Sequence, residues 1–202
     1  MRNSKVTKMV QMAILIAIIL LMAFTPIGYI RTGALSITFI MIPVVIGAMI
    51  LGPAAGALLG TVFGLTSFAQ CFMGDVFGAT LVNINPIFTF ITCVLARTLT
   101  GYLTGVLFNL IKKADKTKTV CYFAGGLIGA VLNTVFFMGA LMAFFWNTDL
   151  IQGINESTGG KGVLAVVVAM VTINGVLEWF STCALGGIVS KAVNKIVKSN
   201  EV

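Results

Sequence analysis

Apolar side chains run through nearly the whole of this 202-residue chain, and few segments are polar enough to face water. Hydrophobic residues make up 58% of the sequence and charged residues only 9%, with a mean hydropathy of +1.06. A water-soluble domain draws roughly a quarter of its residues from the charged types. We therefore expect the bilayer to be the solvent. Because lipid offers no hydrogen-bond partner to open backbone groups, the spanning segments are expected to be helices.

The apolar runs predict an all-α membrane protein with a single transmembrane domain over residues 1–202. Six spans are predicted, at residues 9–26, 36–52, 53–72, 85–111, 120–146 and 163–190. The first run follows a basic start, as in a signal peptide, but its length of about 18 residues is enough to span. No small-residue cleavage site precedes Gly28, so we expect a retained helix. Pro53 is expected to open the third span after a tight turn at Gly52.

The net charge of +7 is typical of nucleic-acid-binding proteins, but its distribution indicates membrane topology instead. Ten of the thirteen basic residues stand in three clusters, each next to the end of an apolar run. The clusters are Arg2/Lys5/Lys8, Lys112/Lys113/Lys116/Lys118 and Lys191/Lys195/Lys198. Basic residues gather in cytoplasmic loops. Both termini are therefore predicted to be cytoplasmic, with residues 28–35, 72–84 and 147–161 in outer loops, and no nucleic-acid partner is expected.

The sequence argues against an enzyme and against a bound metal or cofactor. It contains no histidine, and its four cysteines are scattered without a CxxC pair, so zinc and haem sites are not expected. An intramembrane enzyme would need a nucleophile–base pair or paired carboxylates, and the predicted spans hold neither. No GxxxxGK[ST] run is present to bind ATP phosphates.

Small residues recur every four positions along several spans. Gly52, Gly56, Gly60 and Gly64 form one such stripe, and stripes of this kind let helix backbones approach closely in a membrane. Ala13 and Ala17 have the same spacing on the first span, among bulky neighbours. They predict either a seam within the bundle or a docking face for another membrane subunit.

Two ionisable residues fall inside predicted spans, Arg97 and Glu178, and each costs about 2.5–3.5 kcal/mol at a helix centre. Counted from the nearest basic clusters at about 1.5 Å per residue, Arg97, Asn133 and Glu178 lie at one level, roughly 20–22 Å deep. Asn174 is one turn from Glu178 on the same face. One interpretation is a structural Arg97–Glu178 ion pair. The other is a polar pocket open to the outside that binds a small polar ligand.

At the level of whole motifs, the chain resembles the S-components of energy-coupling-factor (ECF) vitamin transporters. The resemblance rests on PIGYIRTGALSITFIMIPVVIGAMILGPAAGALLGTVFGLTSF, NINPIFTFITCVLARTLTG, GAVLNTVFFMG and INGVLEW, in this order. It implies a six-helix subunit of the plasma membrane, of prokaryotic type, that captures a vitamin outside. The partners that it implies are a transmembrane coupling subunit and two ATPase subunits. An AxxxA-type motif on the first helix contacts the coupling subunit in this family, so that role is carried onto Ala13 and Ala17.

The resemblance and the polar level together predict the substrate-binding residues. These are Tyr29, Arg31, Asn85, Arg97, Asn133, Asn147, Asn174 and Glu178. The two arginines suit a carboxylate and the asparagines suit hydroxyls and an amide, so pantothenate is the favoured vitamin, with folate and riboflavin as alternatives. Two other functions stay open: a small proton-coupled transporter that uses Glu178, and a structural subunit that binds no ligand.

Overall fold

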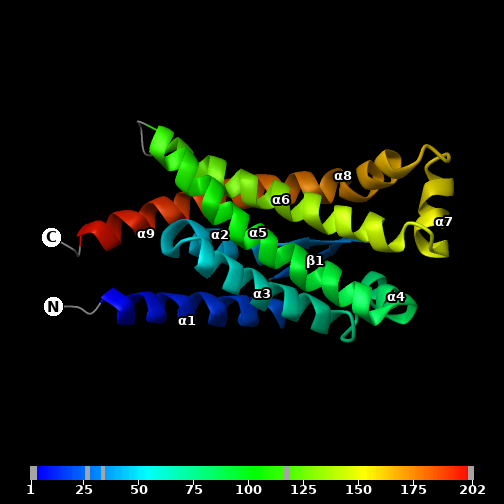
Figure 1. The fold of residues 1–202 in the computed structure, drawn as a ribbon, viewed down its shortest axis with the longest axis horizontal. Coiled ribbons are helices and arrows are strands. Elements are labelled where there is room, and N and C mark those ends of the chain that lie inside the picture. The colour runs from blue at the N-terminus through cyan, green and yellow to red at the C-terminus, as the bar shows by residue number, and fades with distance from the viewer. Residues whose placement is uncertain (1–3, 26–27, 33–34, 116–118, 200–202) are drawn as a thin grey trace.

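The computed structural model describes residues 4–25, 28–32, 35–115 and 119–199, and it is almost entirely helical. In chain order the elements are α1 (Ser4–Ala23), β1 (Tyr29–Thr32), β2 (Leu35–Thr38), α2 (Met41–Leu51), α3 (Pro53–Gln70), α4 (Val76–Ile84), α5 (Pro86–Ala114), α6 (Val120–Phe145), α7 (Asp149–Ser157), α8 (Val163–Ser181), the π-helical turn η1 (Thr182–Gly186) and α9 (Gly187–Ser199). The long helices run side by side in an elongated bundle, with both termini at one end and α4 and α7 at the other (Figure 1).

Four helical segments of the described chain are long and apolar enough to cross a membrane. They are Lys5–Ala23, Pro86–Ala114, Val120–Phe145 and Gly175–Val193. The last segment crosses η1, so α8, η1 and α9 continue one another as a single rod. These segments support four of the predicted spans, while the count of six crossings and the cytoplasmic position of the termini stay predictions.

The second predicted span was wrong in its first part. Residues 36–38 belong to the β1–β2 hairpin, and helix α2 begins only at Met41. Its 11 residues cover about 16 Å, roughly half of a hydrocarbon core. The missed signal was the alternation of Leu35, Ser36, Ile37 and Thr38, because apolar and polar residues with a period of two favour a strand. The hairpin is antiparallel, with Tyr29 opposite Thr38 and Arg31 opposite Ser36, and β2 contacts α8.

The two longer loops that were predicted to lie outside also contain structure that was not predicted. Helix α4 occupies most of the segment 72–84, and α7 most of the segment 147–161. Ile151 of α7 is fully buried and belongs to a cluster that joins α4, α6, α7 and α8. These helices are therefore packed onto the end of the bundle rather than being open linkers.

The predicted turn between the second and third spans is confirmed in detail. Gly52 has a φ of +101° and Pro53 takes the first position of α3. A positive φ favours glycine, and the missing N–H of proline costs nothing at the start of a helix. The turn brings α3 back beside α2, so that both helices face the same core.

Glycines set the spacing of α3 and α5, which are antiparallel neighbours. A Cβ added at Gly60 would collide with the carbonyl oxygen of Arg97, and one added at Gly56 with that of Gly101. At Gly64 the nearest atom to such a Cβ would be Cα of Val94, at 2.6 Å. The small-residue stripe predicted on the third span therefore packs directly against the helix that carries Arg97.

Buried side chains form two separate clusters, one toward each end of the bundle. The termini-side cluster comprises Ile19, Ala23, Ile40, Met41, Val44, Val45, Met49, Leu59, Phe63, Phe108, Cys121 and Tyr122. The loop-side cluster comprises Leu81, Met138, Leu141, Met142, Phe145, Ile151, Val166 and Met170. Between the two clusters lies the level at which the polar residues of the spans were predicted.

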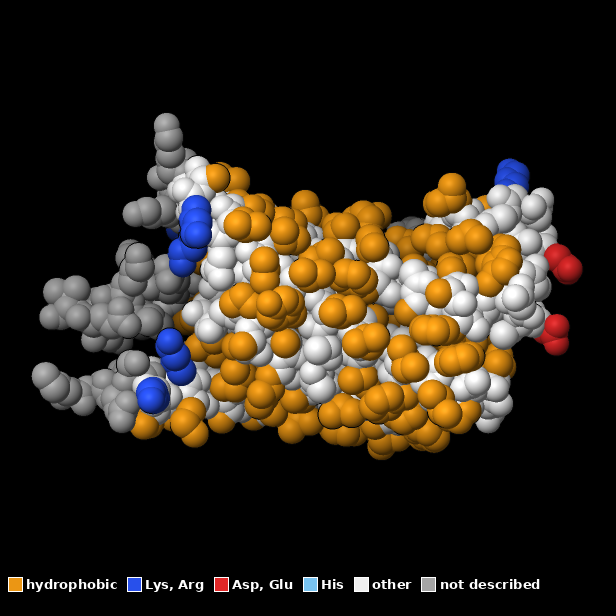
Figure 2. Space-filling model, in the orientation of Figure 1, with side chains coloured by type: hydrophobic (Ala, Val, Ile, Leu, Met, Phe, Trp, Pro, Cys, Tyr) orange, Lys and Arg blue, Asp and Glu red, His pale blue; other side chains and the backbone are white. Residues whose placement is uncertain are grey.

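The surface between the ends is mostly apolar, whereas charge is confined to the ends (Figure 2). Exposed lysines gather at the end that carries the termini: Lys5, Lys8, Lys112, Lys113 and Lys191. The opposite end exposes Asp149, Glu156 and Lys161. An apolar belt flanked by charged ends fits a chain that lies across a bilayer.

Candidate functional site

Arg97 lies in the middle of α5 and is buried inside the bundle, with 8% of its surface exposed. Its Nη1 donates a hydrogen bond of 3.1 Å to the carbonyl oxygen of Cys93, one turn earlier. Its Cζ lies 4.6 Å from the ring centroid of Phe63 and 5.0 Å from that of Phe137. The buried Nε has no hydrogen-bond partner. One edge of the guanidinium is thus held while a donor on it stays unused.

Asn133 and Glu178 meet between α6 and α8. Nδ2 of Asn133 donates a hydrogen bond of 3.0 Å to Oε1 of Glu178. This bond fixes the amide orientation and leaves Oδ1 of Asn133 buried without a donor. A buried polar atom without a partner costs about 1–3 kcal/mol, so the site retains hydrogen-bonding capacity that a ligand can use.

A second bond between the same helices holds them in register. Nε1 of Trp179 donates to Oγ1 of Thr134 at 3.0 Å. Trp179 follows Glu178 and Thr134 follows Asn133, so the two bonds are adjacent and join the same pair of turns. Two parallel side-chain bonds restrict both sliding and rotation of α8 against α6.

Arg97, Asn133 and Glu178 come together as the depth comparison predicted, but not as an ion pair. Asn133 binds Glu178 directly, and Phe137, which lies against Arg97, is one helical turn from Asn133. Within the described part of the chain, Arg97 and Glu178 have no contact within the 4.0 Å limit of an ion pair. The two charges are near enough to interact electrostatically, but neither side chain is held by direct contact with the other.

Asn85 lies at the start of α5, next to α4, and its side chain also has a structural role. Its Oδ1 accepts hydrogen bonds from the backbone N–H groups of Ile87 and Phe88, at 3.0 and 3.1 Å, and so caps the start of α5. Its acceptor oxygen is thereby occupied. Asn147 is exposed just beyond the end of α6.

Three other predicted binding residues have side chains outside the described part of the structure. By their backbone positions, Tyr29 and Arg31 lie on β1, and Asn174 lies in α8, four residues before Glu178. Their role in a site stays a prediction.

Two side chains beside Arg97 were missed by the sequence reasoning, Phe63 and Phe137. Position 137 is four residues after Asn133, so helical periodicity placed it on the same face. No comparable signal pointed to Phe63, because its contact with Arg97 depends on how α3 packs against α5.

Ala13 and Ala17 are both exposed on the outer side of α1, in the belt between the charged ends. The opposite side of that helix, which includes Ile19 and Ala23, enters the termini-side cluster. The structure therefore excludes a seam within this bundle as the reason for the small pair. A surface available to lipid or to another membrane subunit remains.

Comparison with family models shows which class of protein this chain belongs to. The family model described as "ECF transporter, substrate-specific component" matches residues 7–186, which is most of the chain. This chain belongs to that family. It is an S-component, a transport subunit of the membrane rather than an enzyme, and the resemblance found in its motifs is confirmed.

A second comparison found a similar individual protein. The S-component is similar to the pantothenate transporter PanT of Leuconostoc mesenteroides subsp. mesenteroides, with 35% identity over 143 residues. The match covers 67% of this chain and 68% of the relative. Family membership implies a vitamin as substrate and an ECF transporter module as partner.

The chemistry of the site suits binding rather than reaction. It presents a buried cation, a carboxylate and an amide, all on helices and all held by neighbouring side chains. In the part of the chain that the structure describes, no group of three or more His, Cys, Asp or Glu side chains is placed to hold a metal ion. A small molecule with an acidic group and several hydrogen-bonding groups matches this set.

Proposed function

We propose that this S-component captures pantothenate outside the cell and delivers it inward with an ATP-driven coupling module. The observation that carries the proposal is Arg97, a buried cation with an unused donor and no ion-pair partner among the described residues. A buried charge is costly until an opposite charge meets it. The likeness to a pantothenate transporter supports an acidic vitamin as that partner.

In this proposal each polar group of the site receives one part of the ligand. The guanidinium of Arg97 binds the carboxylate, for which its planar donor set is well suited. The free Oδ1 of Asn133 accepts a hydrogen bond from a hydroxyl or the amide N–H, and Glu178 accepts from another hydroxyl. Asn174 extends this wall by one turn, with Tyr29, Arg31 and Asn147 toward the outer side. Asn85 is left out because it caps α5.

Orientation in the membrane follows from the charged ends. The lysine-rich end with both termini is assigned to the cytoplasm of a prokaryotic cell, and the end with α4 and α7 to the outside, in agreement with the positive-inside rule. The site then lies in the middle of the bundle, beneath the α4 and α7 end. Six crossings are proposed. The segments that contain α2 and α3 are the second and third of them, and the turn at Gly52 joins them.

The first experiment identifies the ligand. The protein is purified in detergent without added vitamin, denatured, and the released small molecules are measured by mass spectrometry. Equilibrium titrations with pantothenate, folate and riboflavin follow. We expect pantothenate to be released and to bind most tightly. Release of a different vitamin, with no binding of pantothenate, would reject the substrate while leaving the family assignment intact.

Ala13 and Ala17 are proposed to contact the transmembrane coupling subunit of a module that also contains two ATPase subunits. The support is their exposure on α1 and the fit of small residues to close helix packing. Ala13→Trp should block copurification with the coupling module and leave vitamin binding unchanged. Ala143→Trp, at an exposed alanine of α6, is the matched control. Equal assembly of the Ala13→Trp and control proteins would refute the contact.

A further inference from the structure

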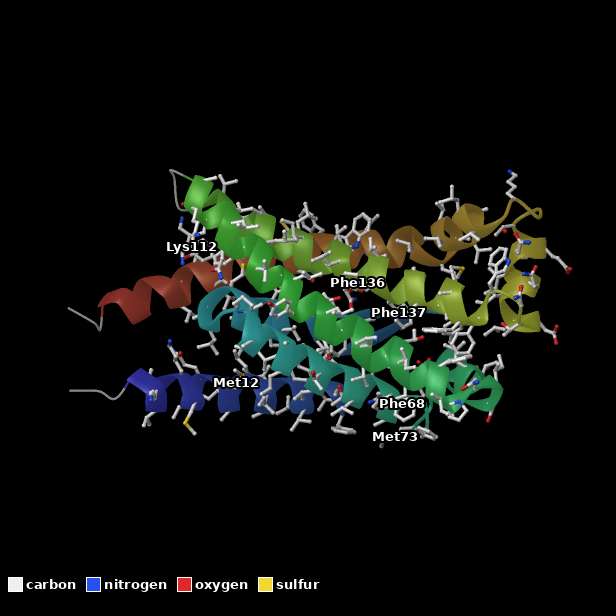
Figure 3. All side chains as sticks on the ribbon, in the orientation of Figure 1. Met12, Phe68, Met73, Lys112, Phe136 and Phe137 are labelled. Atoms are coloured by element: carbon white, nitrogen blue, oxygen red, sulfur yellow. The ribbon has the colours of Figure 1, made fainter. Side chains whose placement is uncertain are left out.

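The guanidinium of Arg97 lies close to two phenyl rings from helices that are far apart in sequence, Phe63 of α3 and Phe137 of α6. Figure 3 labels Phe137 and its neighbour Phe136 on α6. We infer that these two rings form an aromatic clamp that positions Arg97 and makes the site selective for a ligand with a carboxylate over one with a neutral group. Phe63 and Phe137 act through Arg97 and are therefore positioning residues. The inference rests on the proposed function.

The first step is geometric. A guanidinium is a planar group whose five N–H donors lie in its plane, so its faces can rest on aromatic rings while its edge makes hydrogen bonds. Here Cζ lies 4.6 and 5.0 Å from the two ring centroids, which is within the range of cation–π contacts. Nη1 is tied to the carbonyl oxygen of Cys93. The head group is thus held from α3, α5 and α6 at once.

The second step concerns charge. An aspartate or glutamate in contact with Arg97 would neutralise it, and an incoming carboxylate would have to displace that partner. A phenyl ring attracts the cation through its quadrupole and carries no net charge. The clamp therefore holds the buried cation without a carboxylate in direct contact with it. Because Glu178 is engaged by Asn133 and makes no ion pair with Arg97, the described site matches this arrangement.

The third step concerns the helices that carry the rings. Phe63 is fully buried, and it stands on α3 between Gly60 and Gly64, which press that helix onto α5. Phe137 stands one turn from Asn133 on α6. The clamp therefore fixes the position of Arg97 relative to Asn133, which sets the distance between the carboxylate-binding and hydroxyl-binding parts of the site.

The test compares two probes that differ at one group: pantothenate, and pantothenol, in which a primary alcohol replaces the carboxylate. Affinities are measured by isothermal titration on detergent-purified protein. For Phe137→Leu we expect the preference for pantothenate over pantothenol to fall about tenfold, as one desolvated cation–π contact is lost. Pantothenol itself should bind with little change. Phe137→Tyr keeps the ring and should restore the preference.

Phe136→Leu is the matched control, because it makes the same change at the preceding residue of α6, which points in a different direction from the helix. It should leave the preference unchanged. If Phe137→Leu weakens both probes equally, the ring serves packing alone and the clamp is overturned. The same conclusion follows if Phe136→Leu lowers the preference as much as Phe137→Leu does.

A measurement without ligand separates the clamp from the proposed function. A double-mutant cycle of Phe137→Leu with Arg97→Gln on thermal unfolding should show coupling, since each change removes the same contact. Additive effects would overturn the clamp, even in a protein that binds pantothenate. Coupling in a protein that binds no pantothenate would reject the proposed substrate and support the clamp.

Discussion

Replacing Gly60 with alanine tests the seam that places Arg97. An added Cβ would collide with the carbonyl oxygen of Arg97, and its next neighbours would be the carbonyl carbon of Arg97 and Cα of Thr98, at 2.9 and 3.3 Å. All three are backbone atoms of α5, which cannot rotate away as a side chain can. The helices must therefore separate, and the turn of α5 that carries Arg97 must move with them.

The size of the effect follows from this geometry. Overpacking a tight contact costs about 1–3 kcal/mol, and each kcal/mol lowers the melting temperature of a chain of this size by roughly 2–4 °C. We expect the melting temperature of Gly60→Ala to be several degrees lower than that of the unmodified protein. We also expect weaker ligand binding, because Arg97 is displaced from Asn133 and from the clamp.

The assay is tryptophan fluorescence on heating in detergent, followed by titration with pantothenate. Gly139→Ala is the control, because Gly139 is an exposed residue of α6 and no atom lies within 4 Å of an added Cβ. That change should leave stability unchanged or raise it by up to about 1 kcal/mol, through helix propensity. Equal melting temperatures for the two variants would refute the role of the seam.

Three further predictions each concern one hydrogen-bonded site. Asn133→Ala removes the donor to Glu178, a bond to a charged group of about 1.5–3 kcal/mol, so we expect titration to show pantothenate binding weakened at least tenfold in a protein that still folds; unchanged affinity would contradict the site. Trp179→Phe and Thr134→Val each break the second bond between α6 and α8 and should lower the melting temperature, with a double variant no worse than the more damaging single change. Asn85→Ala should cost about 1 kcal/mol of stability through the lost helix cap without altering affinity, and Asn85→Asp should keep most of that stability. A loss of affinity without a loss of stability would return Asn85 to the binding site.

The membrane class and the polar level could be predicted from the sequence because both depend on spacing along single helices. Depth is set by the rise per residue, so counting from the lysine clusters was enough to place Asn133 level with Glu178, and the two are hydrogen-bonded. The glycine stripe was predictable for the same reason, since a period of four puts Gly56, Gly60 and Gly64 on one face.

The hairpin and the cap were not foreseen because each depends on short local patterns. Four alternating residues, Leu35 to Thr38, are too few to stand out within an apolar run. Asn85 was counted among the binding residues because it was expected near the outer mouth of the bundle. Only the backbone geometry around Pro86 shows that its side chain satisfies the first N–H groups of α5 instead.

By itself, the sequence of this S-component determined that it lies in a membrane, that it is helical, where its lysine clusters stand and how deep its polar residues lie. These properties depend on residue type and on distance along one helix. Tertiary structure alone decided which neighbours Arg97 has. Sequence left an ion pair with Glu178 open, but the packing of α3 and α6 around α5 places Phe63 and Phe137 against the guanidinium and gives Glu178 to Asn133. The reason is physical: charge and depth show which groups can meet, whereas the direction in which each helix face points is fixed only when the backbones are in contact.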